Sequence, residues 1–198
     1  MSIPIYGTRL TLGLLTNKLK EHRLNPTMVE VTPGKKFNLG CFGIDFIRAS
    51  HSMPDAASIA IDTPRGTVLF TGDFKIDFTP VDGVNMELPK LAEIGTRGGQ
   101  YAFADSTNGD RAGYTMSERT VGEAFKQQFY DAPSRIIVAT FASNLHRVQQ
   151  VITATEYFDK KLVISGRSMV NNIEVALRLG YLKIKKDTII DINRMNDY

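Results

Sequence analysis

Cysteine is almost absent from this sequence, since Cys41 is the only one among 198 residues. A single thiol excludes an internal disulfide, so the chain does not belong to the disulfide-stapled class of small secreted domains. Because Cys41 lies within a strand-like pattern, we expect a buried, inert thiol. The sequence also lacks any run of about 18 apolar residues and any signal-peptide pattern at its start. We therefore expect a cytoplasmic protein that makes no contact with a membrane.

Net charge is also low, at +3 from 24 Lys and Arg against 21 Asp and Glu. Such a balance is too weak to indicate nucleic-acid binding by itself, so any basic surface must be local. Internal repeats and low-complexity tracts are absent as well. What the chain does have is 42% apolar residues, enough for one large core or for parts of two.

The pattern of apolar residues changes near residue 115. Before it, short strands alternate with turns and with two expected helices, over residues 10–22 and 88–99. After it, helix and strand alternate strictly, which is typical of βαβ units and a parallel sheet. The expected helices there cover 117–131, 144–158 and 170–182, and the expected strands cover 135–141 and 161–166. We predict an α/β protein with one partial domain in residues 1–115 and a second in 116–198.

Three strand-like runs in the first part end on polar side chains. FGIDFIRAS runs into His51, GTVLFTGD ends on Asp73 after a glycine turn, and YAFAD ends on Asp105. If the three strands lie side by side, these side chains share one rim of a sheet. Imidazole nitrogen and carboxylate oxygen suit zinc or manganese, and a catalytic site would keep one position open for water.

Each of these residues also has an ordinary structural explanation. His51 can be a strand-end histidine bonded to backbone, Asp73 a turn residue, and Asp105 a cap for the following loop. Taken singly, the three residues favour these explanations over a metal site. Two protein ligands are also too few for a complete metal site.

Taken together, the motifs SHSMPDA, TGDFK and ADSTN carry a resemblance. With IPIYGTRLTLGLL, RIIVATFASNLHRVQQ and ISGRSMVNNIEVALRLGYL, they make the chain similar to the metallo-β-lactamase superfamily, and within it to the β-CASP nucleases of the ribonuclease J type. The resemblance implies part of an αββα sandwich followed by part of a β-CASP domain with a parallel, Rossmann-like sheet. It implies that His51 is a metal ligand and that Asp73 bridges two metals, with two zinc ions, or manganese, in a complete site. Asp105 would orient a metal-binding histidine elsewhere, so the catalytic candidates are Asp73 and Asp105.

Several motifs of that family are missing from this sequence. The leading HxHxDH motif does not occur, and the only histidines are His22, His51 and His146, no two of which lie two positions apart. The downstream SGH and VHGE-like segments are missing too. We therefore interpret the chain as a middle piece of the catalytic core that is inactive by itself.

The second part offers candidates for phosphate binding. Residues 140–147 and 166–172 each follow an expected strand and open a helix, where backbone N–H groups can receive anions. These two segments contain the candidate RNA- and phosphate-binding residues Ser143, Asn144, His146, Arg147, Arg167 and Ser168. The alternative is ordinary helix capping by Ser and Asn, with arginines on a solvated face.

The resemblance favours a metal-dependent ribonuclease that hydrolyses RNA phosphodiesters, with RNA as partner. One alternative is a non-catalytic RNA-binding or scaffold module that keeps a β-CASP-like sheet. A small-molecule hydrolase of the same superfamily is disfavoured, because such enzymes have no reason to carry the second part. Unpaired sheet edges favour self-association, and we expect the full-length protein to be a homo-oligomer.

Overall fold

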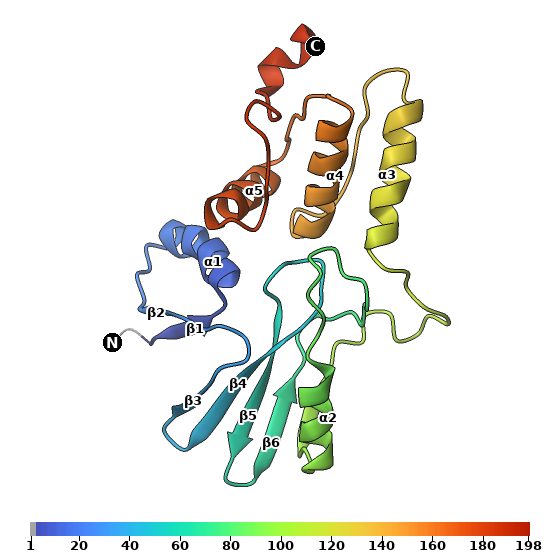
Figure 1. Ribbon diagram of the computed structural model, residues 1–198. Coiled ribbons are helices and arrows are strands. Elements are labelled where there is room, and N and C mark those ends of the chain that lie inside the picture. Colours follow the sequence, from blue (N-terminus) through green and yellow to red (C-terminus); the bar gives the residue numbers. More distant parts are fainter. Residues whose placement is uncertain (1–2) are drawn as a thin grey trace. The chain divides into compact units, whose positions relative to one another are not determined.

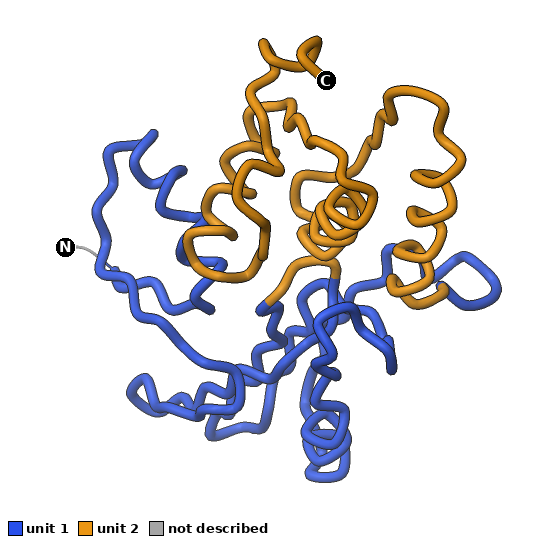
Figure 2. The backbone as a smooth tube through the Cα atoms, turned by 45° about the horizontal axis from the view of Figure 1, so that its top comes forward, with its two compact units in different colours: residues 1–51, 55–115 blue, residues 52–54, 116–198 orange. Residues whose placement is uncertain are grey.

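The computed structural model describes residues 3–198. Most of the segments predicted as helices or strands adopt that structure (Figure 1). The elements are β1 (Ile5–Gly7), α1 (Arg9–Glu21), β2 (Met28–Glu30), β3 (Lys36–Leu39), β4 (Phe42–Arg48), β5 (Ala57–Thr63), β6 (Gly66–Phe70), α2 (Leu88–Thr96), β7 (Tyr101–Phe103), α3 (Arg119–Asp131), α4 (Leu145–Tyr157), α5 (Arg167–Leu179) and the 3-10 helix η1 (Ile192–Asp197). Residues 1–51 and 55–115 form one compact unit, and residues 52–54 and 116–198 form a second (Figure 2).

The main sheet of the first unit has the strand order β3-β4-β5-β6-β7. Strands β3 to β6 pair antiparallel with their neighbours, whereas β7 joins β6 in parallel. Because two antiparallel steps separate β4 from β6, the strands β4, β6 and β7 all run in one direction. Their carboxyl ends therefore lie along one edge of the sheet, although β5, which the sequence pattern did not resolve, separates β4 from β6.

Helix α2 covers one face of this sheet. Ile47, Ala60 and Ile94 form a buried cluster there, against which Leu69 and Leu91 pack. Phe46, on the opposite face of β4, is also buried. Ile47, on the face that α2 covers, is fully buried, so β4 is buried on both of its faces at this point.

A buried carboxylate lies on the same face as α2. Asp45 of β4 is only 4% exposed and lies 3.4 Å from the ammonium of Lys36 on the neighbouring strand. The ammonium of Lys90 on α2 lies 3.7 Å from its other oxygen. Both lysines remain partly exposed, so the two ion pairs hold the charge of Asp45 while water still reaches their cationic ends. The contact with Lys90 ties α2 to the sheet.

A short parallel pair, β1 with β2, carries α1. Leu10 and Leu12 at the start of this helix are buried, and the helix covers most of the segment in which one was predicted. The helix has Lys18 and Lys20 in its last turn but no acidic residue in its first turn. Its own N-cap residue, Thr8, makes no capping hydrogen bond from its side chain, so the N-terminal end of α1 lacks an anion of its own.

The second unit consists mainly of α3, α4 and α5. Phe129, Val151 and Ala154 form its buried cluster, against which partly buried apolar residues pack, namely Phe125, Ile136, Val138, Phe158 and Leu162. The three predicted helices are present, and α5 begins three residues earlier than expected.

The two predicted strands of the second unit are not paired into a ladder within residues 3–198. Residues 135–141 keep the alternation of a strand, with Ile136 and Val138 partly buried and Ile137 94% exposed, but no other described segment pairs with them. In the segment 161–166, Leu162 forms a single parallel bridge with Ile189. A strand needs a backbone partner as well as a pattern. The α/β class is confirmed. The parallel sheet expected in the second unit is not formed within residues 3–198, where the bridge between Leu162 and Ile189 is its only trace.

The predicted burial of Cys41 is wrong, because this residue is exposed. It follows Gly40, whose φ is +62°, in the two-residue turn between β3 and β4. The apolar alternation continues on both sides of the turn and therefore does not reveal it. Among residues 3–198, no helix is both long and apolar enough to cross a membrane.

We predict that Ile47→Ala lowers the free energy of unfolding by about 2–5 kcal/mol, because it removes fully buried methyl groups and leaves a cavity. Urea unfolding followed by circular dichroism measures the loss. The control is Ile3→Ala in the same unit, where the side chain is 81% exposed and we expect a change within about 0.5 kcal/mol. Equal losses for the two variants would contradict the assignment of Ile47 to the core.

Candidate functional site

The edge at which β4, β6 and β7 end brings His51 and Asp73 together. Each residue follows its strand, β4 or β6, by three positions. The Nε2 atom of His51 lies 3.7 Å from Oδ2 of Asp73, with the side chains 32% and 76% exposed. The predicted convergence of an imidazole and a carboxylate is therefore present in the structure.

Thr71, which the sequence reasoning did not single out, organises this edge. Its backbone N–H donates to the carbonyl of Phe103 at 3.0 Å, and its hydroxyl oxygen accepts from the N–H of Asp105 at 3.0 Å. The hydroxyl of the fully buried Ser58 donates to the carbonyl of Thr71 at 2.7 Å. These bonds fix the end of β6 against β5 and against the exit of β7. The only signal in the sequence was the threonine of the TGD turn.

Gly72 makes the turn that carries Asp73 away from β6. Its φ is +59°, a conformation that side chains disfavour, and a Cβ there would meet the carbonyl oxygen of Ala57 at 3.4 Å. After the turn, the N–H of Lys75 donates to the carbonyl of Ser50 at 2.7 Å. The backbone segments on which His51 and Asp73 lie are thus joined directly.

Asp105 lies at the same edge, two residues after β7. Its Oδ1 accepts hydrogen bonds from the hydroxyl of Thr107 at 2.6 Å and from the N–H of Thr107 at 3.0 Å. These bonds hold the pKa of Asp105 below its ordinary value, and a backbone hydrogen bond from Phe74 and the electrostatic interaction with His51 act in the same direction. Asp105 is therefore an ionised acceptor near His51.

Beside the carboxylates lies a hollow of about 570 Å³. It is lined by Phe70, Gly72, Asp73, Ala102, Phe103, Ala104 and Asp105. The rings of Phe70 and Phe103 stack with their centroids 4.8 Å apart, and both side chains are exposed. The lining of the hollow therefore includes two carboxylates and two exposed aromatic rings.

The donor pair suits a metal in kind and in spacing. A tetrahedral zinc ion with bonds of about 2.0–2.2 Å separates two of its ligand atoms by about 3.4 Å, close to the 3.7 Å between His51 and Asp73. However, residues 3–198 contain no group of three His, Cys, Asp or Glu side chains that could hold a metal ion. A catalytic zinc site needs three protein ligands and a water. The described residues therefore offer His51 and Asp73 as candidate donors but no complete donor set, and no catalytic step follows from them alone.

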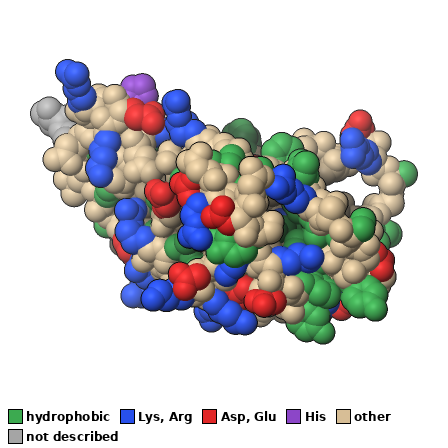
Figure 3. Space-filling model, turned by 90° about the horizontal axis from the view of Figure 1, so that it is seen from above, with side chains coloured by type: hydrophobic (Ala, Val, Ile, Leu, Met, Phe, Trp, Pro, Cys, Tyr) green, Lys and Arg blue, Asp and Glu red, His purple; other side chains and the backbone are tan. Residues whose placement is uncertain are grey.

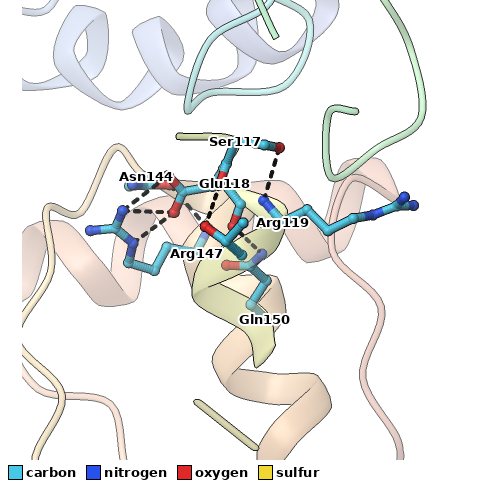
Figure 4. A network of polar contacts seen from close by, with 7 residues as sticks. Ser117, Glu118, Arg119, Asn144, Arg147 and Gln150 are labelled. Atoms are coloured by element: carbon cyan, nitrogen blue, oxygen red, sulfur yellow. Dashed lines mark hydrogen bonds and ion pairs between the residues drawn. The ribbon is translucent and has the colours of Figure 1, made fainter. Parts of the chain in front are cut away.

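The predicted phosphate-binding residues around the start of α4 have partners within the second unit (Figure 4). The side chain of Asn144 accepts from the N–H of Arg147 at 3.0 Å and so caps the helix. The guanidinium of Arg147 donates to both carboxylate oxygens of Glu118, at 2.7 Å from Nε and 3.0 Å from Nη2. His146 is 9% exposed, and its N–H donates to the carbonyl of Ser52 at 3.2 Å.

This geometry matches the alternative of helix capping for Asn144, and it gives Arg147 a structural partner. Glu118 was not among the candidate site residues. In the structure its backbone carbonyl also accepts from the Nε2 of Gln150 at 2.8 Å, so Glu118 joins α3 to α4. Phosphate binding by Arg147 stays a prediction. A phosphate would have to compete with the Glu118 carboxylate for the guanidinium of Arg147.

The remaining candidates are more accessible. Ser143 is exposed just before α4, and Arg167 and Ser168 are exposed in the first turn of α5. Gly166 precedes them with a φ of +100° and provides no side-chain cap. The side chain of Asn172 donates to the carbonyl of Ala142 at 2.9 Å and so connects α5 with the segment before α4.

Comparisons with known proteins extend over the whole chain. Residues 133–198 match the family model described as ribonuclease J, β-CASP domain. The chain is 43% identical over 199 residues to ribonuclease J of Thermus thermophilus, covering 98% of this chain and 35% of that protein. It is 42% identical to ribonuclease J of Corynebacterium glutamicum, covering 96% and 27%. For ribonuclease J of Helicobacter pylori J99 the identity is 39%, covering 100% and 29%.

A crystal structure of a protein of unknown function from Enterococcus faecalis V583 has a similar fold. The TM-score is 0.69 at 12% sequence identity, with 96% of this chain and 50% of that chain covered. The predicted resemblance to ribonuclease J is thus confirmed, while the chain spans only about a third of the length of the curated relatives it matches.

We predict that the carboxyl of Asp105 titrates below 3.8 and that Thr107→Ala raises its pKa, because the largest cause of the lowering is the hydrogen bond from the Thr107 hydroxyl. A folded-state pKa below the unfolded value contributes stability that is present above pH 3.8 and is lost as the pH falls through the folded pKa. Carbon-detected NMR of the aspartate carboxyls measures the titration.

Thr79→Ala is the matched control, because Thr79 donates to Asp77 through the same two groups, its N–H and its hydroxyl. That change should leave the pKa of Asp105 where it is. A Thr107→Ala chain with an unaltered Asp105 titration would show that the hydroxyl is not the cause.

Proposed function

We propose that this chain, which is similar to ribonuclease J along nearly all of its length, forms part of the catalytic core of a metal-dependent ribonuclease. The observation that carries the proposal is the approach of His51 to Asp73 at 3.7 Å. It occurs at the edge where three strands of one direction end, which is where the resemblance to metallo-β-lactamase nucleases requires metal ligands.

In this proposal His51 and Asp73 would hold the metal together with ligands outside this chain. Zinc, or manganese, when held by the complete ligand set, supplies Lewis acidity for hydrolysis of an RNA phosphodiester. Asp105 acts as a fixed acceptor, since the two hydrogen bonds from Thr107 orient its carboxylate and keep it ionised. Its role is to orient an imidazole rather than to take up a proton.

RNA as substrate and a cytoplasmic location also belong to the proposal. RNA as substrate is supported by the similarity to proteins named ribonuclease J, and the location by the low cysteine content. Homo-oligomer formation by the full-length protein stays a prediction.

We predict that the chain alone binds zinc weakly through His51 and Asp73 and does not cleave RNA at any zinc or manganese concentration, because affinity depends on ligand count. Isothermal titration calorimetry of the chain and of its His51→Ala and Asp73→Asn variants measures the first part. His22→Ala is the control, since His22 is exposed at the end of α1.

Zinc binding that survives both site substitutions would reject the proposed donor pair. Cleavage of a labelled RNA by a nuclease-free preparation, if abolished by Asp73→Asn, would show that the donors in this chain suffice for activity.

A second candidate function is RNA binding without catalysis, through the first turn of α5. Arg167 and Ser168 are exposed there, Gly166 before them has no side chain to cover the helix end, and helix N-termini bind phosphate readily. On the face drawn in Figure 3, Lys and Arg side chains are interspersed with Asp and Glu among the described residues. RNA binding on that face would therefore depend on local groups rather than on a broad basic field.

For this function, Arg167→Ala should weaken RNA binding and reduce the slope of log K against log salt by about 1, because one phosphate contact is lost. Fluorescence anisotropy with a single-stranded RNA over a salt series measures both quantities. Arg178→Ala, at the exposed opposite end of the same helix, is the control. Unchanged affinity in Arg167→Ala excludes this residue, whereas a loss in Arg147→Ala alone reflects its pair with Glu118.

A further inference from the structure

The loop that follows β4 contains an aspartate in an unusual backbone conformation. Asp55 has a φ of +65°, in the left-handed region that aspartate tolerates better than most residues but that still carries strain. The loop is closed at its base, where the N–H of Ala49 donates to the carbonyl of Ala56 at 3.0 Å. A strained residue next to this closure indicates that the surrounding contacts hold it there.

One such contact connects Asp55 with α1. Oδ2 of Asp55 accepts from the backbone N–H of Leu10 at 3.3 Å, at the second position of the helix. Helix α1 has no acidic residue in its first turn and no capping side chain of its own. The carboxylate of Asp55, from a position 45 residues later in the sequence, therefore supplies the anion that this helix end favours.

The same loop carries His51 between two fixed points. On the β4 side, the carbonyl of Ser50 accepts from Lys75 N–H at 2.7 Å, which fixes the backbone next to His51. On the β5 side, the bond between Asp55 and Leu10 fixes the returning chain. With the base closed, a loop held on both sides leaves the backbone at His51 little freedom, and the imidazole is directed toward Asp73.

We propose that Asp55 is a positioning residue, which holds the loop so that the His51 imidazole stays beside Asp73. The inference rests on the proposed function for its consequence, since a rigid first ligand matters only if the pair binds a metal. Its structural content does not depend on that function, because the orientation of His51 can be measured in the absence of metal.

Two variants separate the contributions of Asp55. Asp55→Gly keeps the left-handed backbone without strain but removes the acceptor for Leu10. Asp55→Asn keeps both an acceptor oxygen and tolerance of that backbone. The matched control is Asp187→Gly in the second unit, because Asp187 has nearly the same φ of +64°. All three variants retain the sequence around His51.

The first measurement uses NMR without metal, namely the nuclear Overhauser contact between the His51 ring and Asp73 and the averaging of the His51 side-chain torsion. We expect both to match wild type in Asp55→Asn and Asp187→Gly, whereas Asp55→Gly loses the contact and averages the torsion. An Asp55→Gly chain that keeps the contact overturns the proposal. A chain that loses its sheet resonances altogether also overturns it, because Asp55 would then serve the fold in general.

The second measurement is zinc affinity. Asp55→Gly should bind zinc about tenfold more weakly, as expected when a group that orients a metal ligand is removed, while Asp55→Asn stays within about twofold of wild type. If zinc binds nowhere, or binds equally well in His51→Ala, the proposed function fails, yet the NMR comparison still decides the role of Asp55.

Discussion

The common direction of β4, β6 and β7 is the constraint on which the candidate site depends. Two antiparallel steps from β4 to β6 and one parallel step to β7 bring the three carboxyl ends to one edge. Strand β5 lies between β4 and β6 and takes part in both antiparallel steps, so β4 and β6 run in the same direction. A parallel pairing at either step would carry His51 to the edge opposite Asp73.

Direction alone does not orient side chains, and small polar residues at the strand ends complete the arrangement. Thr71 connects the end of β6 to Phe103 and Asp105 through its N–H and its hydroxyl. Gly72 adopts a left-handed backbone conformation that turns the chain away from β6 before Asp73. The hydroxyl of Thr107 donates to the Asp105 carboxylate and fixes it. The bonds that Thr71 makes satisfy polar groups of the partly buried strand ends, whereas the bonds from Thr107 to Asp105 are exposed and orient the carboxylate. The same bonds define the geometry of the site.

Local patterns in the sequence predicted much of this fold. Helical spacing located all five α-helices, and strand-end polarity located His51, Asp73 and Asp105. The sequence could not reveal contacts between distant residues, such as Asp55 with Leu10 or Arg147 with Glu118, because nothing local encodes which partner a carboxylate finds. It also could not distinguish a strand from an unpaired extended segment at 135–141, since both show the same alternation. The predicted burial of Cys41 was wrong for a similar reason, because the two-residue turn at this position interrupts the strand pattern too briefly to be recognised.

The second unit shows why an arginine near a helix start is weak support for phosphate binding. Arg147 holds both oxygens of Glu118, and that carboxylate is 19% exposed. Releasing the guanidinium to a phosphate would leave a largely buried carboxylate without its cation, a cost that the new contact must offset. Among the described residues, no carboxylate forms an equivalent ion pair with Arg167. If the second unit contacts RNA, free-energy considerations therefore favour the start of α5 over the start of α4.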